Sequence, residues 1–168
     1  KVLRAAASAQ RRTGAAILIH PGRDEAAPFE ILEVLEQAGA DIRRVIMGHL
    51  DRTFFNPDLL LELAGRGTYL EYDLFGWEVS NYPLSLTRDM ISDAQRLDWI
   101  QRLIAAGHVA QIVLGQDIYS KHRTTRYGGH GYHHILENIA PRMRQRGISD
   151  TDINTIYVEN PARVLTLA

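Results

Sequence analysis

The chain has 168 residues, of which 45% are hydrophobic and 23% charged, a composition that is typical of a globular protein and excludes disordered and collagen-like chains. With 19 Lys and Arg against 20 Asp and Glu, the formal charge is −1, and no basic block indicates a nucleic-acid partner. There is no cysteine, which excludes disulfides and thiolate metal sites, and no apolar run approaches the roughly 18 residues that span a membrane. We therefore expect a soluble, cytoplasmic protein with no membrane partner.

A helical pattern starts at the first residue of the chain. Residue 1 is Lys1, and Val2, Leu3 and Ala6 follow with helical spacing although no capping residue precedes them. This start favours a chain cut from a longer protein. We expect residues 1–168 to form one domain.

Short apolar runs recur along the chain, and a segment with helical spacing follows each of them. Such runs are typical of strands that are covered on both faces. The runs that predict strands are residues 15–20, 44–49, 68–73 and 111–117. The segments that predict helices begin near Pro28, Asn56, Arg96 and Tyr132, and a last helix is expected after Asn160 as its N-terminal cap.

The alternation of strands and helices predicts the α/β class, with a parallel sheet and right-handed crossovers. A closed (β/α)8 barrel needs eight strands and about 250 residues, whereas about four strand–helix units are visible here. We therefore expect half of a TIM barrel, and a small doubly wound sheet is the alternative.

Polar side chains end all four predicted strands, namely His20, His49, Asp73 and Asp117. In a parallel sheet these ends meet at one edge, where ligands bind, and neighbouring strands lie about 5 Å apart. A lone His after an apolar strand is more often a structural residue, but its repetition at the same place favours a joint site. Imidazole and carboxylate suit a zinc-like divalent cation that keeps an open position for water.

The loop after the fourth strand, residues 120–130, is too polar and too rich in glycine for a protein core. In a strand–helix barrel this loop borders the active site. Arg123 and Arg126 are candidates to bind an anionic substrate group, and Tyr127 is a further candidate substrate-binding residue. The alternative is a solvated loop whose cations have no partner.

Aromatic and histidine residues outside the strand ends give weaker signals. Trp77 is a candidate substrate-binding residue and Tyr82 a candidate pocket wall, although aromatic side chains in loops often only pack their own loop. His130, His133 and His134 form the densest histidine cluster. Because His133 and His134 are adjacent on a predicted helix and point in different directions, we expect no joint metal site there.

Several short motifs carry a family resemblance. They are residues 19–23 (IHPGR), 47–53 (MGHLDRT), 71–76 (EYDLFG), 115–118 (GQDI), 127–132 (YGGHGY) and 160–163 (NPAR). Together they resemble the phosphotriesterase family, and most closely its phosphotriesterase-related group, over essentially the whole chain. The resemblance places the chain in the C-terminal half of the family's TIM barrel, within the metal-dependent hydrolase superfamily.

The resemblance implies a zinc-type binuclear hydrolase that attacks its substrate with a metal-bound hydroxide. By motif, His20 and His49 match two ligands of the more exposed metal, and Asp117 matches a ligand of the buried metal that also accepts the proton of the attacking water. Two divalent cations, most simply zinc, would occupy each complete site. Their charge makes hydroxide available near neutral pH.

The chain also departs from the family pattern. The family completes its site with an upstream His-x-His pair and a strand-ending carboxylated Lys, but the only lysines here are Lys1 and Lys121, and neither ends a predicted strand. Some members relay a proton through a His and a second Asp, where this chain has Leu74 and Arg52. The resemblance therefore implies half of a metal site without that relay.

Two functions of different classes follow. The first is a metal-dependent hydrolase of a small ester, lactone, amide or phosphoester, in which this chain supplies part of the site. The alternative is a non-catalytic α/β half-barrel that serves in binding or assembly. Because a half barrel exposes unpaired strand edges, we expect either a second copy of the chain or the missing N-terminal half as a partner.

Overall fold

The computed structural model describes residues 1–79, 82, 84 and 89–167. Its centre is a sheet of four parallel strands in the order β1-β2-β3-β4. The strands are β1 (Ile17–Ile19), β2 (Val45–Met47), β3 (Tyr69–Tyr72) and β4 (Ile112–Leu114). Each strand pairs with its neighbour in the sequence, which is the order of a barrel wall. The predicted α/β half barrel is confirmed.

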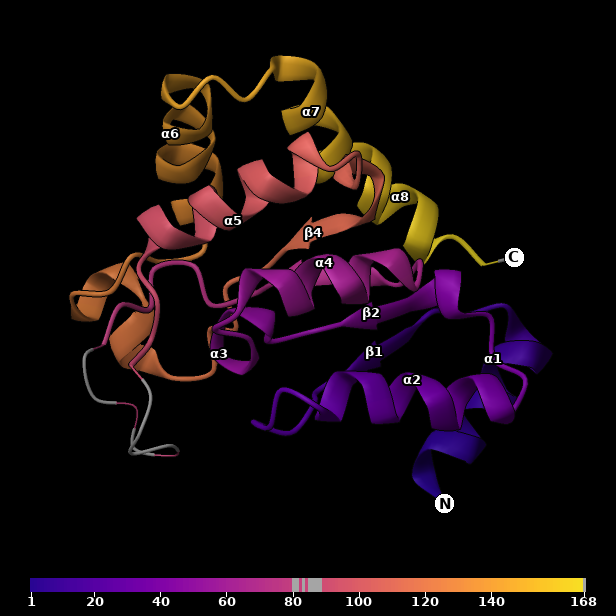
Figure 1. Ribbon diagram of the computed structural model, residues 1–168. Coiled ribbons are helices and arrows are strands. Elements are labelled where there is room, and N and C mark those ends of the chain that lie inside the picture. The colour runs from indigo at the N-terminus through magenta and orange to yellow at the C-terminus, as the bar shows by residue number, and fades with distance from the viewer. Residues whose placement is uncertain (80–81, 83, 85–88, 168) are drawn as a thin grey trace.

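Helices follow the strands as the apolar spacing predicted. The helices are α1 (Val2–Thr13), α2 (Ala27–Gln37), α3 (Leu50–Thr53), α4 (Pro57–Gly65), α5 (Asp93–Ala105), α6 (Ala140–Gln145), α7 (Asp150–Asn154) and α8 (Asn160–Leu165). Two π-helical turns, Ile135–Ile139 and Thr155–Glu159, lead into α6 and α8. Helices α2, α4 and α5 lie side by side on one face of the sheet (Figure 1). No helix in the described part of the chain is long and apolar enough to cross a membrane.

One expected helix boundary is wrong. Asn160 does not cap a new helix, because its backbone is helical (φ −64°, ψ −51°) and continues from α7 through the π-helical turn. Its buried side chain instead donates hydrogen bonds to the carbonyls of Val109 and Ile112, at 2.8 and 2.7 Å. Asn160 therefore attaches the last helix to β4, and the helix begins at Asp150, after the cap Ser149.

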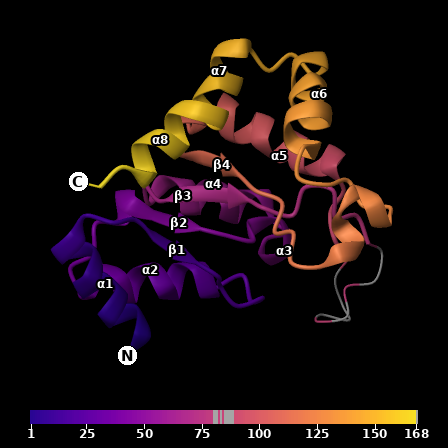
Figure 2. The same cartoon turned by 180° about the vertical axis from the view of Figure 1, so that it is seen from behind.

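The two faces of the sheet have different surroundings, because successive strand residues point to opposite sides. On one face, Ile19, Met47 and Leu70 are buried in the main core with the helices. On the other face only a small cluster forms, around Ile46, Tyr69 and Val113, and Leu18 remains 64% exposed. Figure 2 shows this second face from behind, without a layer of helices across the strands. It corresponds to the interior wall of a barrel.

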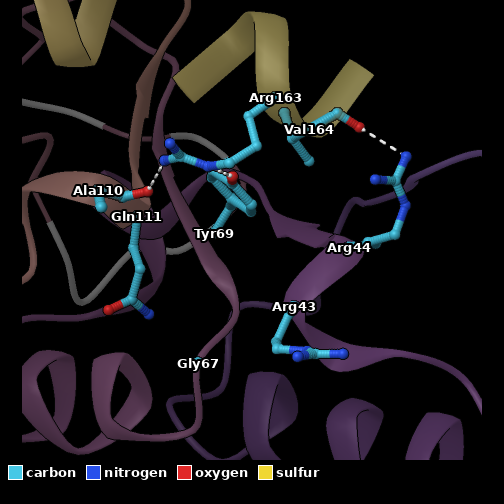
Figure 3. A pocket seen from close by; sticks show the side chains of 8 residues that line it. All are labelled: Arg43, Arg44, Gly67, Tyr69, Ala110, Gln111, Arg163 and Val164. Carbon is cyan, nitrogen blue, oxygen red and sulfur yellow. Dashed lines mark hydrogen bonds between the residues drawn. The ribbon is translucent and has the colours of Figure 1, made fainter. Parts of the chain in front are cut away.

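Arginines fasten the last helix at the amino ends of the strands (Figure 3). Arg163 Nε donates to the Tyr69 hydroxyl at 2.8 Å, and its Nη2 donates to the Ala110 carbonyl at 2.7 Å. Arg44 Nη2 donates to the carbonyl of Val164 at 3.2 Å. The cavity between these side chains, about 280 Å³, is thus lined by guanidinium groups that already serve the fold. In a strand–helix barrel the amino ends of the strands serve stability, and ligands bind at the opposite end, where the strands finish.

Candidate functional site

The carboxyl ends of the strands bring the four predicted polar residues into one cavity. His20 follows β1, His49 follows β2, Asp73 follows β3 and Asp117 follows β4. These residues line a cavity of about 360 Å³, which we call the inner cavity. The remaining lining residues are Leu18, Ile19, Glu71 and Gly115. The common position of the strand ends therefore produces a common site.

A hydrogen-bonded chain fixes the two histidines. His49 Nδ1 lies 2.8 Å from Asp73 Oδ1, and the backbone N–H of His49 donates to Asp73 Oδ2 at 3.0 Å. His49 Nε2 lies 2.7 Å from His20 Nδ1, and Arg52 Nη2 lies 3.1 Å from His20 Nε2. Since a guanidinium only donates, the chain of donors runs from Arg52 through His20 and His49 to Asp73. Both rings are thereby held in one orientation.

Two of the site residues have left-handed backbone, with φ 54° at His49 and φ 42° at Asp117. No other described residue except glycine has positive φ. Such a conformation costs about 1–2 kcal/mol for most residues, and less for Asp. Both residues line the inner cavity. The two described non-glycine residues with this strained backbone, His49 and Asp117, therefore both lie at the same site.

Carboxylates dominate the inner cavity. Burial, followed by the charge of Asp73, raises the pKa of Glu71 to about 8. Burial also raises the pKa of Asp51, behind the cavity, to about 6, although Arg96 opposes this shift. Gly48 and Gly115 leave room for these groups, since a Cβ on either would approach Asp73 to about 3 Å. This environment therefore favours the protonated form of Glu71 near neutral pH, and a bound cation would favour its ionised form.

A second cavity of about 290 Å³, the outer cavity, adjoins the first and shares His20, His49 and Asp117 with it. Its other lining residues are Arg23, Arg52, Leu74, Trp77, Tyr82, Leu84 and Tyr119. Burial lowers the pKa of Arg52. Burial, and then the charges of His49, Arg52 and Arg23, lowers the pKa of His20. The outer cavity is thus cationic where the inner one is acidic.

The donor set fits a divalent cation in its chemistry, but it is incomplete. His20 Nδ1 and His49 Nε2 share a hydrogen bond at 2.7 Å, whose proton a bound cation would replace, and Asp117 lines the same cavity. Imidazole nitrogens and carboxylates are the ligands that zinc takes, and Asp73 holds His49 from behind as an outer partner does at metal sites. Among the described residues, however, no group of three or more His, Asp or Glu is arranged to hold a metal ion. Further ligands would have to come from elsewhere.

The residues predicted to bind substrate do not all reach the cavities. Trp77 lines the outer cavity. Arg123 is buried behind it, with its guanidinium 5.2 Å from the Trp77 ring centre and Nη1 donating to the Asp117 carbonyl at 2.6 Å. Arg126 and Tyr127 lie exposed on the turn Thr125–Tyr127 and line neither cavity. Substrate binding by these residues stays a prediction.

The histidine cluster forms no common site. His134 is buried and its Nε2 lies 2.8 Å from Asp93 Oδ2. His130 stacks on His134 with ring centres 4.2 Å apart. His133 instead faces Glu137 on the surface, at 3.7 Å. The expected divergence of these side chains is confirmed.

Sequence reasoning missed the buried support behind the site. Arg96 is fully buried, with Nε donating to Asp51 at 2.7 Å and Nη1 to Asp93 at 2.8 Å. Its Nη2 donates to the carbonyl of Trp77 at 3.1 Å, and Asp51 accepts the backbone N–H of Leu74 at 3.0 Å. This network holds the loop after β3 against the sheet. The one sign of this network in the sequence was Arg96 itself, a charged residue on the apolar side of α5.

Comparisons with known proteins identify the family of the chain. The model of the phosphotriesterase family matches residues 1–165. The N-acetyltaurine hydrolase of Dictyostelium discoideum is 54% identical over 167 residues, which are 99% of this chain and 45% of that protein. The N-acetyltaurine hydrolase of Mus musculus is 48% identical over 99% of this chain and 48% of that protein. The chain spans about half the length of the curated relatives it matches.

Solved structures show the same fold. A resiniferatoxin-binding protein from Rhodobacter sphaeroides superposes with a TM-score of 0.90 at 34% identity, over 97% of this chain and 45% of that chain. A phosphotriesterase homology protein from Escherichia coli, solved with phosphate in its active site, superposes with a TM-score of 0.85 at 28% identity, over 98% of this chain and 53% of that chain. With the family match over nearly all residues, these findings show that the chain belongs to the phosphotriesterase family.

Proposed function

We propose that the protein is a metal-dependent hydrolase that cleaves the amide bond of a small N-acylated amino sulfonate. The observation that carries the proposal is the facing pair of His20 Nδ1 and His49 Nε2 at 2.7 Å, in a cavity that also contains Asp117. Relatives named N-acetyltaurine hydrolase support an amide substrate with a sulfonate group. A cytoplasmic location stays a prediction from the sequence.

The site requires completion from outside the described residues. His20, His49 and Asp117 would hold divalent cations, most simply zinc, and the remaining ligands would come from the other half of the family's barrel. We propose that the chain is the C-terminal half of the barrel. Its partner is then the other half or a second copy of the chain. The sheet face with exposed Leu18 supports this proposal, because a closed barrel would cover that face.

The residues of this chain have separate roles in the proposed reaction. When bound, divalent cations lower the pKa of water and polarise the carbonyl of the substrate. Asp117 accepts a proton from the attacking water, because its carboxylate is exposed in both cavities. Asp73 keeps His49 in the tautomer whose Nε2 faces His20. Trp77 and Leu74 exclude water from the outer cavity.

Hydrolysis of N-acetyltaurine by the intact protein tests the proposal. The protein would be stripped with a chelator and then given zinc, cobalt or manganese, and acetate release would be measured. We expect turnover only after a metal is restored, and loss of turnover in His20→Ala. Equal turnover of the stripped and the loaded protein would refute metal dependence.

A non-catalytic binding or assembly module is the second candidate function. It is favoured by one observation, the lack of a three-ligand metal group among the described residues. It predicts that the intact protein binds N-acetyltaurine or a partner without consuming any amide, with or without added metal. Acetate release above the buffer control would exclude it.

A further inference from the structure

Arg52 is a buried cation that contacts no carboxylate among the described residues. Its exposed fraction is 3%, and its donors reach neutral acceptors, namely the Pro21 carbonyl at 3.0 Å and the Gly22 carbonyl at 3.3 Å, besides His20 Nε2. Within the described residues Arg52 forms no ion pair with a carboxylate. A buried charge without an opposite charge in contact lowers the stability of the fold. A functional role therefore explains the position of Arg52 better than a contribution to stability.

Arg23 places a second guanidinium on the same cavity. It is half-buried, and its Nε donates to the Tyr82 hydroxyl at 3.0 Å while the guanidinium lies 5.5 Å from the centre of that ring. The described structure shows no carboxylate paired with Arg23 either. The tyrosine ring and hydroxyl hold its position and leave the positive charge uncompensated.

Other arginines have partners that serve the fold. Arg44 and Arg163 donate to backbone carbonyls at the opposite end of the sheet. Within the described part of the chain, five arginines pair with carboxylates within 4 Å, namely Arg43, Arg66, Arg96, Arg144 and Arg146. The outer cavity therefore collects guanidinium groups that lack such partners, although the chain as a whole carries a formal charge of −1. Because Arg123 also points its Nη1 at a carbonyl rather than a carboxylate, this region of the loops is locally cationic.

The walls of the outer cavity limit what can enter it. The Trp77 ring packs against Tyr82 and Tyr119, with ring centres 5.9 and 6.1 Å apart. Leu74 adds an apolar surface on the side of β3. A short ligand with one charged end fits this combination of flat apolar walls and two cationic groups, and its other end would then lie at His20 and His49.

We propose that Arg52 and Arg23 form a subsite for the terminal oxyanion of the substrate, a sulfonate in the first instance, and so determine specificity for acidic amides. This inference rests on the proposed function, because it assumes that the amide lies at the histidine pair. Two guanidinium groups can give an oxyanion several charge-assisted hydrogen bonds. The methylene groups between the oxyanion and the amide meet the apolar walls of Trp77 and Leu74.

Binding and turnover would be measured separately on the intact protein. Calorimetry would use N-acetyltaurine and its uncharged analogue N-acetylethanolamine as probes, on the wild type, Arg23→Met and Arg52→Lys. Arg102→Met is the matched control, because Arg102 is exposed on α5 and lines neither cavity. Arg52→Lys keeps a positive charge and a donor toward Pro21, and circular dichroism would confirm that it folds.

We expect each site variant to weaken N-acetyltaurine binding by about tenfold or more, with Arg102→Met and N-acetylethanolamine binding unchanged. In turnover Arg23→Met should raise KM for the sulfonate with little change in kcat, whereas Arg52→Lys should also lower kcat, because Arg52 Nη2 holds His20 at 3.1 Å. An equal loss for the charged and uncharged probes, or no loss in either site variant, would overturn the subsite.

The two proposals fail in different ways. A wild type that binds N-acetyltaurine through Arg52 and Arg23 but releases no acetate would refute the hydrolase and support the subsite. A wild type that cleaves N-acetylethanolamine as well as N-acetyltaurine, with equal KM values, would support the hydrolase and refute the subsite.

Discussion

The inner and outer cavities share His20, His49 and Asp117, but carboxyl groups gather around the first and guanidinium groups around the second. The inner cavity is lined by strand residues and by the residues that follow the strands, among which Glu71 and Asp73 supply carboxyl groups. The outer cavity is lined by residues of the loops and of α3, among which Arg23 and Arg52 supply guanidinium groups. In the reaction that we propose, the metal ligands thus lie at the ends of the strands, and the groups that select the substrate lie in the segments beyond them.

Replacing a histidine shared by both cavities should have the largest effect. His49→Ala removes the nitrogen that faces His20 and the anchor to Asp73. We expect turnover to fall by about 1,000-fold or more, as when a main catalytic interaction is lost, together with loss of bound zinc measured by mass spectrometry. His133→Ala, at a half-exposed histidine paired with Glu137, is the control. Retained metal and turnover in His49→Ala would contradict the role of the inner cavity.

Removing the buried support of both cavities should cost stability. Arg96→Met leaves the carboxylates of Asp51 and Asp93 buried without their cation. We expect the free energy of unfolding to fall by about 3–5 kcal/mol in urea titrations. Arg146→Met, which breaks the exposed pair with Asp98, should cost less than about 1 kcal/mol. Similar losses in the two variants would show that the buried network contributes no more than a surface pair.

The acidity of the inner cavity can be tested by pH. Glu71 has its pKa raised from 4.5 to about 8, so between these values the folded metal-free protein holds a proton that the unfolded chain has lost. Its stability should therefore fall as pH rises through this range, by at most about 1.4 kcal/mol per pH unit. Glu71→Gln should remove this part of the slope. Urea midpoints of the stripped proteins at about pH 5, 7 and 9 would measure it, and parallel slopes would contradict the assignment.

The left-handed backbone at Asp117 should give the smallest effect. Glycine adopts φ 42° without strain, whereas alanine does not. We expect Asp117→Gly to be more stable than Asp117→Ala by about 1 kcal/mol, with turnover lost in both. At Ser120, where φ is −139°, the alanine variant should instead be the more stable one. Thermal melting of the four variants would show whether the order reverses between the two positions.

The strand ends could be predicted because they depend on local signals. Continuous apolar runs predicted each strand, and the parallel order of the sheet then required His20, His49, Asp73 and Asp117 to meet at one edge. The sequence also indicated the family and half of its barrel. These inferences needed only the chain order and the side-chain period of a strand.

The outer cavity and the buried network could not be predicted in the same way. Arg52 appeared in the sequence only as a departure from a proton relay, because its burial depends on how the loop after β1 folds over it. Arg96 meets Asp51 across 45 positions of the chain, and no periodicity reports such a pair. The sequence predicted Asn160 as a cap because asparagine is common at the first position of a helix. The helix instead continues through Asn160, because the side chain packs on β4 and bonds to carbonyl groups in and just before that strand.

Gly48 and Gly115 restrict how this protein could acquire a new activity. A Cβ on Gly48 would lie 2.9 Å from the Ile19 carbonyl oxygen and 3.1 Å from Asp73 Oδ2, and one on Gly115 would lie 2.9 Å from Asp73 Cβ. A side chain at either position would force a shift of the Ile19 backbone or of Asp73, the residue that holds His49. The positions open to change are those of the loops, so new substrates are more readily gained by altering Arg23 and its neighbours than by rebuilding the ends of the strands.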